Sequence, residues 1–491
     1  MSISLFQLNQ LYKLLKARLR YDNGTILVTG MAQVPFASVD PRTKHLRAQA
    51  LYYQNIVEYL KQSEIVCDDY VLDLIPSPNM LIDNKNVHLA LREYQQKALV
   101  NWTKADKRGC VVLPTGAGKT VIGVKAIEMV NSASIVIVPT IDLMDQWTSV
   151  LSKYFPDTKV GNLGGGTDDI EPITVSTYDS AYLRAAALGN KFALMIFDEV
   201  HHLAAPGYRT IAEQFASPFR LGLTATIERE DELHKDFPKL VGGIVFQAHS
   251  SELARNKHLA SYEIERRQVD MLPEELQEYN KHFGRYQICL KKIGLKMQYA
   301  GAFRRLIMMS GRSRAAREAV LSRNKAMDIA LNSRSKLEEL KKILTNNQGL
   351  KTIIFTQHNK LVYDISDRFL IPFITHKSSK QERQDALSGF KEGRYNAIVT
   401  SKVLDEGVDV PDAELGIIVS GTGSSREFIQ RLGRLLRPKP DSNRKAKLIE
   451  IISSDTREMG TSAKRKRALN NMDRNNNELT SKNQPKFLQD S

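Results

Sequence analysis

A glycine-rich segment in the first half of the chain has the composition of a phosphate-binding loop. It reads LPTGAGKT at residues 113–120 and stands between an apolar run and a helical pattern, although its first position holds leucine where the general motif has glycine. The backbone N–H groups of such a turn, with the positive end of the following helix, surround a phosphate chain. Lys119 would reach the β- and γ-phosphates, and the Thr120 hydroxyl would bind Mg²⁺. We therefore expect Gly116, Gly118, Lys119 and Thr120 to hold a nucleotide.

Two carboxylates follow a second apolar run, residues 193–197. They are Asp198 and Glu199, placed where a parallel strand would end and where open α/β sheets bind ligands. An acidic pair after a strand is often only the first turn of a helix. Behind a phosphate loop, however, Asp198 can hold Mg²⁺ and Glu199 can orient and deprotonate the attacking water. We assign the next pair, His201 and His202, to coupling or structure, because adjacent residues rarely ligate one ion.

Most of the positive charge of the chain is concentrated in residues 281–325. This segment has twelve lysines and arginines and a single acid, Glu318, which gives a net +11 of the +15 of the whole chain. Aromatic residues are interleaved with these bases, as on surfaces that neutralise phosphates and stack bases. A solvated helical face is the alternative, but such a face normally mixes both signs. We predict a polyanion-binding module whose candidate contacts are Phe283, Arg285, Lys291, Lys292, Arg304 and Arg305.

Two groups of short apolar runs must form the sheets that position these residues. Such runs are typical of parallel strands buried on both faces. We expect strands near 110–113, 135–138, 173–175, 194–197 and 220–223, and again near 352–355, 397–400, 415–420 and 447–452. Residues 250–345 lack a comparable run and are expected to be helical. The fold class is therefore α/β, with two parallel sheets and a helical insertion between them.

The ends of the chain differ in composition from this central part. The N-terminal residues predict a small α/β domain with strands near 25–29 and 71–75, and the residues after Ser454 are too polar to fold alone. We divide the chain into an N-terminal domain 1–85, a first α/β domain 86–248, a basic helical insertion 249–335, a second α/β domain 336–454 and a disordered tail 455–491.

Cysteine usage and hydropathy exclude several classes of protein. Cys67, Cys110 and Cys289 lie far apart, so we expect neither a disulfide framework nor a zinc or iron–sulfur site. No run approaches 18 apolar residues and the N-terminus lacks the pattern of a signal peptide, so we expect no membrane partner. The expected location is the cytoplasm, or the nucleus if the chain is eukaryotic.

The motifs together resemble those of superfamily 2 helicases. DEVH at 198–201 and TAT at 224–226 are similar to motifs II and III, and LREYQ at 91–95 is similar to the adenine-reading segment before motif I. Residues 400–411 and 430–437 resemble motifs V and VI. The resemblance implies two RecA-like motor domains that use ATP and Mg²⁺. It assigns adenine contacts to Arg92 and Gln95, coupling to His201, Thr224 and Thr226, a ribose contact to Asp409, and catalytic roles to Gln430, Arg434 and Arg437, the two arginines as fingers toward the γ-phosphate.

A charged triplet directly after motif III points to one branch of this superfamily. Arg229, Glu230 and Asp231 resemble the RED motif of the XPB family, which also has a helical thumb between its motor domains and a damage-recognition domain before them. The length of the chain makes the archaeal members most similar. The resemblance implies 3′-to-5′ unwinding or duplex opening in DNA excision repair and transcription, with the triplet opening the duplex. It also implies a partner nuclease bound at the thumb or the second motor domain.

Other functions remain open from the motifs alone. A double-strand DNA translocase or fork-remodelling motor uses the same ATP site without separating strands. RNA unwinding is another alternative, because motor contacts are mainly to the backbone. A DNA-binding scaffold that recruits a nuclease is a third, but it would not need Lys119, Glu199 and Arg434 together.

Overall fold

The computed structural model forms two compact units, which are described separately. The first comprises residues 1–113 and 118–248, and the second comprises residues 114–117 and 249–491. Among the described residues, every helix is too short or too polar to span a bilayer. The described residues are 16–77, 89–114, 116–225, 236–248, 253, 262–297, 301–401, 413–420, 446–456, 458–460 and 462–463.

The first unit begins with a small five-stranded sheet in the order β3-β4-β2-β1-β5. Strands β1 and β2 form a hairpin whose turn residues, Asn23 and Gly24, both have positive φ (46° and 84°), as a tight two-residue turn requires. The predicted N-terminal α/β domain is therefore confirmed. Its elements are β1 (Ala17–Asp22), β2 (Thr25–Thr29), β3 (Ala37–Val39), β4 (Leu46–Gln49), η1 (Ala50–Tyr52), α2 (Tyr53–Gln62) and β5 (Cys67–Tyr70).

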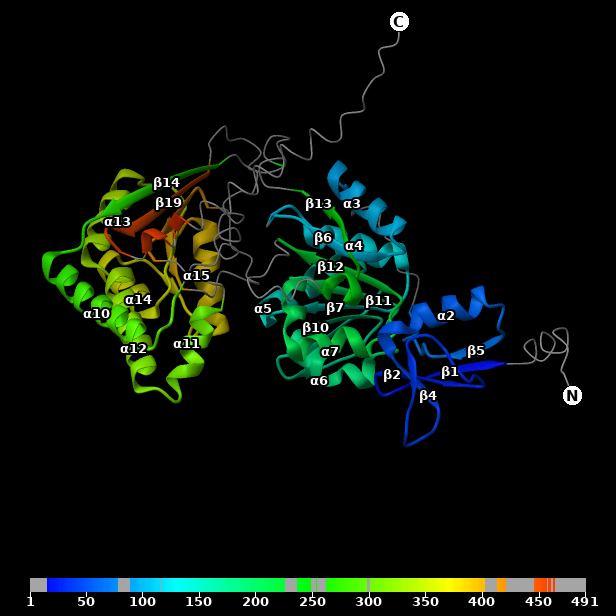
Figure 1. Cartoon of the computed structure of the whole chain (residues 1–491). Helices are drawn as coiled ribbons and strands as arrows, with labels where there is room; N and C mark the ends of the chain where they lie inside the picture. Colours follow the sequence, from blue (N-terminus) through cyan, green and yellow to red (C-terminus); the bar gives the residue numbers. More distant parts are fainter. Residues whose placement is uncertain are drawn as a thin grey trace, which may run out of the picture. The chain divides into compact units, whose positions relative to one another are not determined.

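The strand expected at residues 71–75 is absent, and this segment instead fastens the N-terminal domain to the larger sheet beside it. The N–H groups of Asp73 and Ile75 donate to carbonyls of the loop before β11, at 3.0 and 3.2 Å. The hydroxyl of Tyr21 donates to the carbonyl of Ala186 at 2.8 Å, and burial raises the pKa of Tyr21 to about 12. Residues 71–75 are therefore apolar because they pack against the larger sheet. Figure 1 shows the small sheet beside α6 and α7.

The larger sheet of the first unit has eight strands in the order β13-β6-β12-β11-β7-β10-β8-β9, all parallel except the β8–β9 pair. All five strands predicted from apolar runs are present, and they are almost entirely buried. The strands are β6 (Arg108–Val112), β7 (Ser134–Val138), β8 (Val160–Gly164), β9 (Thr167–Asp168), β10 (Ile173–Thr177), β11 (Leu194–Asp198), β12 (Phe219–Thr224) and β13 (Ile244–Gln247). The helices are α3 (Glu93–Lys104), α4 (Lys119–Val130), α5 (Ile141–Tyr154), α6 (Tyr178–Leu188), η2 (Val200–Ala204), α7 (Pro206–Gln214) and α8 (Phe237–Leu240).

The second unit contains a six-stranded parallel sheet in the order β14-β19-β18-β15-β17-β16. The four strands predicted in this part of the chain are confirmed. The strands are β14 (Tyr262–Val269), β15 (Thr352–Phe355), β16 (Phe373–Ile374), β17 (Ala397–Thr400), β18 (Leu415–Ile418) and β19 (Ala446–Ser453). Helices α13 (Arg334–Asn346), α14 (Asn359–Phe369) and α15 (Lys380–Glu392) pack on the sheet.

Strand β14 corrects the expectation that residues 250–345 are all helical. It pairs with β19 over eight residues at the edge of the sheet. Figure 1 shows the two strands side by side. Its sequence, YEIERRQV, consists mostly of charged and polar residues, and Glu265 bonds Lys447 on the neighbouring strand at 2.6 Å. Such a half-exposed edge strand lacks the apolar run typical of a strand buried on both faces.

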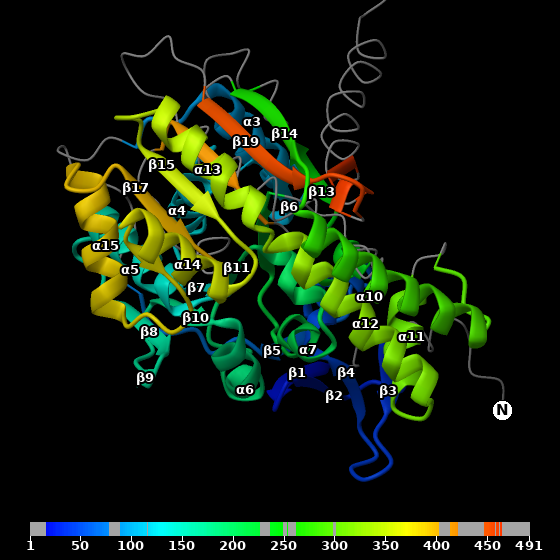
Figure 2. The ribbon, with the colours of Figure 1, turned by 90° about the vertical axis from the view of Figure 1, so that its left-hand side faces the viewer.

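The remaining insertion is helical, as predicted. Helices α10 (Pro273–Lys292), α11 (Ala302–Ser310) and α12 (Arg314–Leu331) pack side by side as a separate group beyond the sheet (Figure 2). We call these three helices the thumb. Glu275 of α10 accepts hydrogen bonds from the Ser333 hydroxyl at 2.8 Å and the Arg334 N–H at 3.1 Å, which fastens the thumb to the start of α13.

Packed residues extend beyond position 454, where we expected a disordered tail to begin. Glu458 is 1% exposed, and both of its carboxylate oxygens accept hydrogen bonds from Lys336 at 2.7 Å. Lys336 also donates to the carbonyl of Val419 at 2.9 Å. The short polar segment folds because its charge has a buried partner on α13. Most of the expected tail lies outside the described residues.

Replacing Lys336 with methionine is expected to destabilise the second unit by about 3–5 kcal/mol, because it leaves the buried carboxylate of Glu458 without its counter-charge. Calorimetric melting of the whole chain should show the change as a lower transition temperature. The control is Lys341→Met on the exposed side of the same helix, with an effect within about 0.5 kcal/mol. Equal melting of the two variants would contradict a structural role for this ion pair.

Candidate functional site

The glycine-rich loop lies between β6 and α4, as the motif predicts. Gly116 and Gly118 have positive φ (84° and 75°), which glycine adopts at little cost. A Cβ atom at Gly118 would lie 2.6 Å from Nε2 of Gln95, so the close approach also requires glycine. Lys119 and Thr120 are the first two residues of α4, where N–H groups and the helix dipole favour an anion.

The segment predicted to contact adenine, residues 91–95, is joined to this loop through Gln95. The side chain of Gln95 is 2% exposed; its Oε1 accepts the Arg92 N–H at 2.8 Å, and its Nε2 donates to the Gly118 carbonyl at 3.3 Å. The guanidinium of Arg92 donates to the Tyr94 hydroxyl at 3.1 Å. The start of α3 and the phosphate loop are therefore held in one arrangement, as expected if both contact one nucleotide.

The two predicted carboxylates stand at the carboxyl end of β11. Asp198 is 6% exposed; its Oδ1 accepts the Glu199 N–H at 3.0 Å and its Oδ2 accepts the indole N–H of Trp147 at 2.8 Å. Burial, and then the charge of Glu199, raise the pKa of Asp198 to about 6, which Lys119 opposes. Two adjacent carboxylates that repel each other in a buried site have the oxygen ligands that Mg²⁺ prefers.

Glu199 lies between the phosphate loop and motif III. Its Oε1 is 3.9 Å from Nζ of Lys119, which also donates to the Leu113 carbonyl at 3.3 Å. Its backbone is left-handed (φ 48°), a conformation uncommon outside glycine and often found at functional sites. The turn places this carboxylate near Lys119, the residue predicted to bind phosphate.

A chain of hydrogen bonds joins motif II to motif III. The Thr224 hydroxyl donates to Oε2 of Glu199 at 3.2 Å, and Nδ1 of His201 lies 3.2 Å from the same hydroxyl. Because the single hydroxyl proton goes to Glu199, Nδ1 is the donor in the second bond. His202 instead packs against the Tyr178 ring at 5.7 Å between ring centres. The arrangement suits the coupling role predicted for His201 and Thr224.

Sequence reasoning missed Trp147, which lies 51 positions before Asp198 and contacts it through α5. In the sequence, a tryptophan in an amphipathic helix indicates only an apolar core. Its indole contacts α4 as well: a Cβ at Gly123 would lie 2.5 Å from Cη2 of the ring. No short motif could have indicated this contact, because it depends on the packing of two helices and a strand.

The remaining predicted residues of the ATP site and the duplex-opening triplet lie outside the described residues. These are Thr226, Arg229, Glu230, Asp231, Asp409, Gln430, Arg434 and Arg437.

The thumb has bases on its surface and aromatic rings in its interior. The side chain of Tyr286 is 2% exposed, and Phe283, a candidate DNA contact, packs on Tyr279 with 5.6 Å between ring centres, so both rings belong to the packed interior of the thumb. The guanidinium of Arg323 covers the Phe303 ring at 4.2 Å. The aromatic residues alternate with bases because they form the helical core. The exposed bases of the predicted interface are Arg285, which pairs with Glu318, and Lys291, Lys292, Arg304 and Arg305.

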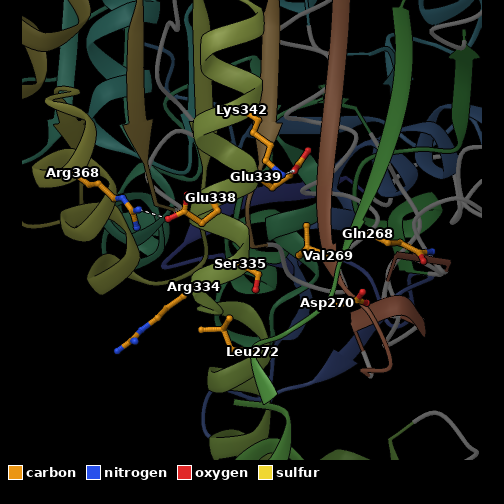
Figure 3. A pocket seen from close by; sticks show the side chains of 10 residues that line it. All are labelled: Gln268, Val269, Asp270, Leu272, Arg334, Ser335, Glu338, Glu339, Lys342 and Arg368. Carbon is orange, nitrogen blue, oxygen red and sulfur yellow. Dashed lines mark hydrogen bonds and ion pairs between the residues drawn. The ribbon is translucent and has the colours of Figure 1, made fainter. Parts of the chain in front are cut away.

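A groove of about 550 Å³ lies at the root of the thumb, between the end of β14 and α13 (Figure 3). Its charges are mixed. Arg368 pairs with Glu338, as the dashed line in Figure 3 shows, and Lys342 lies 3.5 Å from Glu339. Because acids and bases offset each other, the groove lacks the single-sign charge of a polyanion site.

Comparison with known families covers most of the chain. Residues 19–71 match the xeroderma pigmentosum group B helicase damage recognition domain, 88–229 match the type III restriction enzyme res subunit, and 303–485 match the ERCC3/RAD25/XPB C-terminal helicase.

The similar curated proteins are also named as XPB helicases or translocases. The DNA 3'-5' translocase XPB2 of Sulfurisphaera tokodaii is 44% identical over 91% of this chain and 99% of its own length. The DNA 3'-5' helicase XPB of Kineococcus radiotolerans is 28% identical over 77% of this chain, which spans 63% of that protein. The chain spans 47% of the XPB/SSL2 subunit of Saccharomyces cerevisiae transcription and repair factor IIH, at 27% identity. The Pyrococcus furiosus Hef helicase domain structure covers 75% of this chain, and 97% of that domain is covered, with TM-score 0.48 and 21% identity. By its near full-length match to the Sulfurisphaera protein, the chain belongs to the XPB family of DNA helicases and translocases.

Proposed function

We propose that this protein is an ATP-dependent DNA 3′-to-5′ translocase or helicase. It would open duplex DNA during DNA repair and also during transcription. The observation that carries the proposal is the connected set of Lys119, Glu199 and Thr224 at the phosphate loop. Such a set would contact the γ-phosphate, and loss of that phosphate on hydrolysis would change the hydrogen bonds to Thr224 in motif III. The relative similar over nearly its whole length is named a DNA 3'-5' translocase.

The chemistry expected at this site follows from its charges. Mg²⁺, when bound with ATP, would neutralise the developing phosphate charge. Asp198 and Thr120 would hold it, and Lys119 would hold the phosphates. Glu199 would orient the attacking water and accept its proton. The proposal gives Arg434 and Arg437 the role of stabilising the charge that develops in the transition state.

The proposal also includes the DNA substrate and a protein partner. The exposed bases of the thumb would contact the phosphates of single-stranded and forked or damaged duplex DNA. A partner nuclease at the thumb or second motor domain belongs to the same proposal. In a cell without a nucleus, these substrates place the chain in the cytoplasm.

Steady-state ATP hydrolysis with several nucleic acids tests the function. The rate is measured alone and with single-stranded DNA, forked duplex, intact duplex and RNA, beside strand separation on the fork. Stimulation by DNA and not by RNA, with separation of the fork, supports a helicase. Stimulation by intact duplex without strand separation identifies a translocase. A chain that turns over no ATP under any condition would contradict both.

Replacing Arg229, Glu230 and Asp231 together with alanine is expected to impair strand separation and to leave DNA-free ATP hydrolysis intact. The triplet is proposed to act on the duplex and not on the nucleotide. The matched control replaces Lys391, Glu392 and Arg394, three exposed charged residues near the end of α15. Complete loss of DNA-free hydrolysis in the first variant would contradict the assignment.

A further inference from the structure

The two tryptophans of the chain are both buried in the first unit but donate to different kinds of acceptor. Trp102 is 0% exposed and its indole N–H donates to the backbone carbonyl of Arg220 at 3.0 Å. Trp147 is 1% exposed and its indole N–H donates to Oδ2 of Asp198 at 2.8 Å. A buried indole N–H needs an acceptor, and a carbonyl would satisfy it. A hydrogen bond to a carboxylate is stronger than one to a carbonyl, and here it also orients the carboxylate of Asp198.

The ring of Trp147 has little freedom to move. It stands on α5, and its outer edge lies against Gly123 of α4, where even a Cβ atom would come within 2.5 Å. Helix α4 is the one that begins with Lys119 and Thr120. One rigid side chain therefore touches the helix of the phosphate loop and the carboxylate that ends β11.

The orientation of the Asp198 carboxylate is fixed from two sides. The Glu199 N–H occupies one lone pair of Oδ1 and the Trp147 N–H occupies one lone pair of Oδ2. A carboxylate has about four lone-pair sites, so one on each oxygen is left for a cation or its water. A carboxylate held in this way does not need to rotate when the metal arrives.

We infer that Trp147 is a positioning residue that orients the metal-binding carboxylate of Asp198 for Mg²⁺–nucleotide. The inference rests on the proposed ATP site and assigns a role to a residue that lies outside its motifs. Trp147 acts only through Asp198 and does not touch the nucleotide itself. Its effect should therefore appear in the Mg²⁺ dependence of nucleotide binding and leave Mg²⁺-free binding unchanged.

The test uses the full chain and the variants Trp147→Phe and Trp102→Phe. Phenylalanine keeps a ring in the core and removes the N–H. ADP binding is titrated by calorimetry without Mg²⁺ and at a series of Mg²⁺ concentrations. Loss of a partner that orients a metal ligand typically costs about 10–100-fold in metal affinity. We expect a rise of this size in the Mg²⁺ concentration for half-maximal binding in Trp147→Phe, and wild-type behaviour in Trp102→Phe. Equal Mg²⁺ dependence in both variants would overturn the inference.

A second measurement is made on the wild-type chain and uses a variant only to assign the resonances. The wild-type chain labelled with 5-fluorotryptophan has two fluorine resonances, because it has two tryptophans. Trp102→Phe removes one resonance and so assigns both. Adding Mg²⁺ to the ADP complex should shift the Trp147 resonance and leave that of Trp102 in place. If the wild type binds Mg²⁺–ADP and the Trp147 resonance stays unmoved, the inference is wrong while the proposed function stands. If the wild type binds no nucleotide, both are wrong.

Discussion

Replacing Lys119 with alanine is expected to lower ATP hydrolysis by about 10³-fold while DNA binding persists. The Lys119 ammonium is 3.9 Å from the carboxylate of Glu199, and its side chain is 10% exposed. In this position it offsets the negative charge of the two carboxylates at the end of β11, and it would supply positive charge to the phosphates of a bound nucleotide. Alanine removes that charge where little water can replace it. The thumb bases lie in the other unit, so their contacts with DNA phosphates should remain.

The measurement pairs ATP hydrolysis with DNA affinity. Both are determined for wild type, Lys119→Ala and the control Lys125→Ala. Lys125 lies on the same helix and pairs with Glu128 at 2.6 Å, so its replacement matches the change in charge and in helix sequence. Wild-type hydrolysis by Lys119→Ala would remove the whole assignment of the ATP site. Loss of DNA binding together with hydrolysis would show that the variant is misfolded or that the loop contacts DNA.

The sheets could be predicted because parallel strands have an unambiguous signal. The strands β7 and β11 are buried along their whole length, and their apolar runs point to that burial directly. The phosphate loop and the carboxylates were predictable for a related reason. Local backbone geometry fixes where Gly118, Lys119 and Asp198 must stand relative to their own strand, and the connections of a parallel sheet bring strand ends to one edge.

The features that sequence reasoning missed depend on contacts distant in the chain. Strand β14 is rich in charged and polar residues, and its partner β19 begins 184 positions later. Residues 71–75 are apolar because they dock on another domain, which no local pattern distinguishes from a strand. Glu458 packs in the second unit because it pairs with Lys336. The two residues are 122 positions apart, so no local pattern indicates the pair. Tyr286 is buried for the same kind of reason, since neighbouring helices cover its ring.

Replacing Glu199 with glutamine is expected to reduce ATP hydrolysis by about 10²–10⁴-fold while ATP still binds. Glutamine has nearly the size of glutamate and retains an oxygen that can accept the Thr224 hydroxyl, now 3.2 Å from Oε2. It cannot accept the proton of the attacking water. The left-handed turn at this position, with φ of 48°, is set by the backbone, so it should survive the substitution.

Single-turnover hydrolysis and the affinity for a fluorescent ATP analogue distinguish chemistry from binding in this variant. The control is Glu213→Gln on α7, where the carboxylate bonds Arg209 at 3.0 Å, away from the phosphate loop. A selective loss of the chemical step identifies Glu199 as the base, because glutamine keeps the size of the side chain and an oxygen for the Thr224 hydroxyl but has no basic carboxylate. Equal loss of binding and hydrolysis would mean that the carboxylate holds the loop in place, and the proton would then need another acceptor. An unchanged rate would exclude Glu199 from the reaction, and the bonds to Thr224 and His201 would be structural.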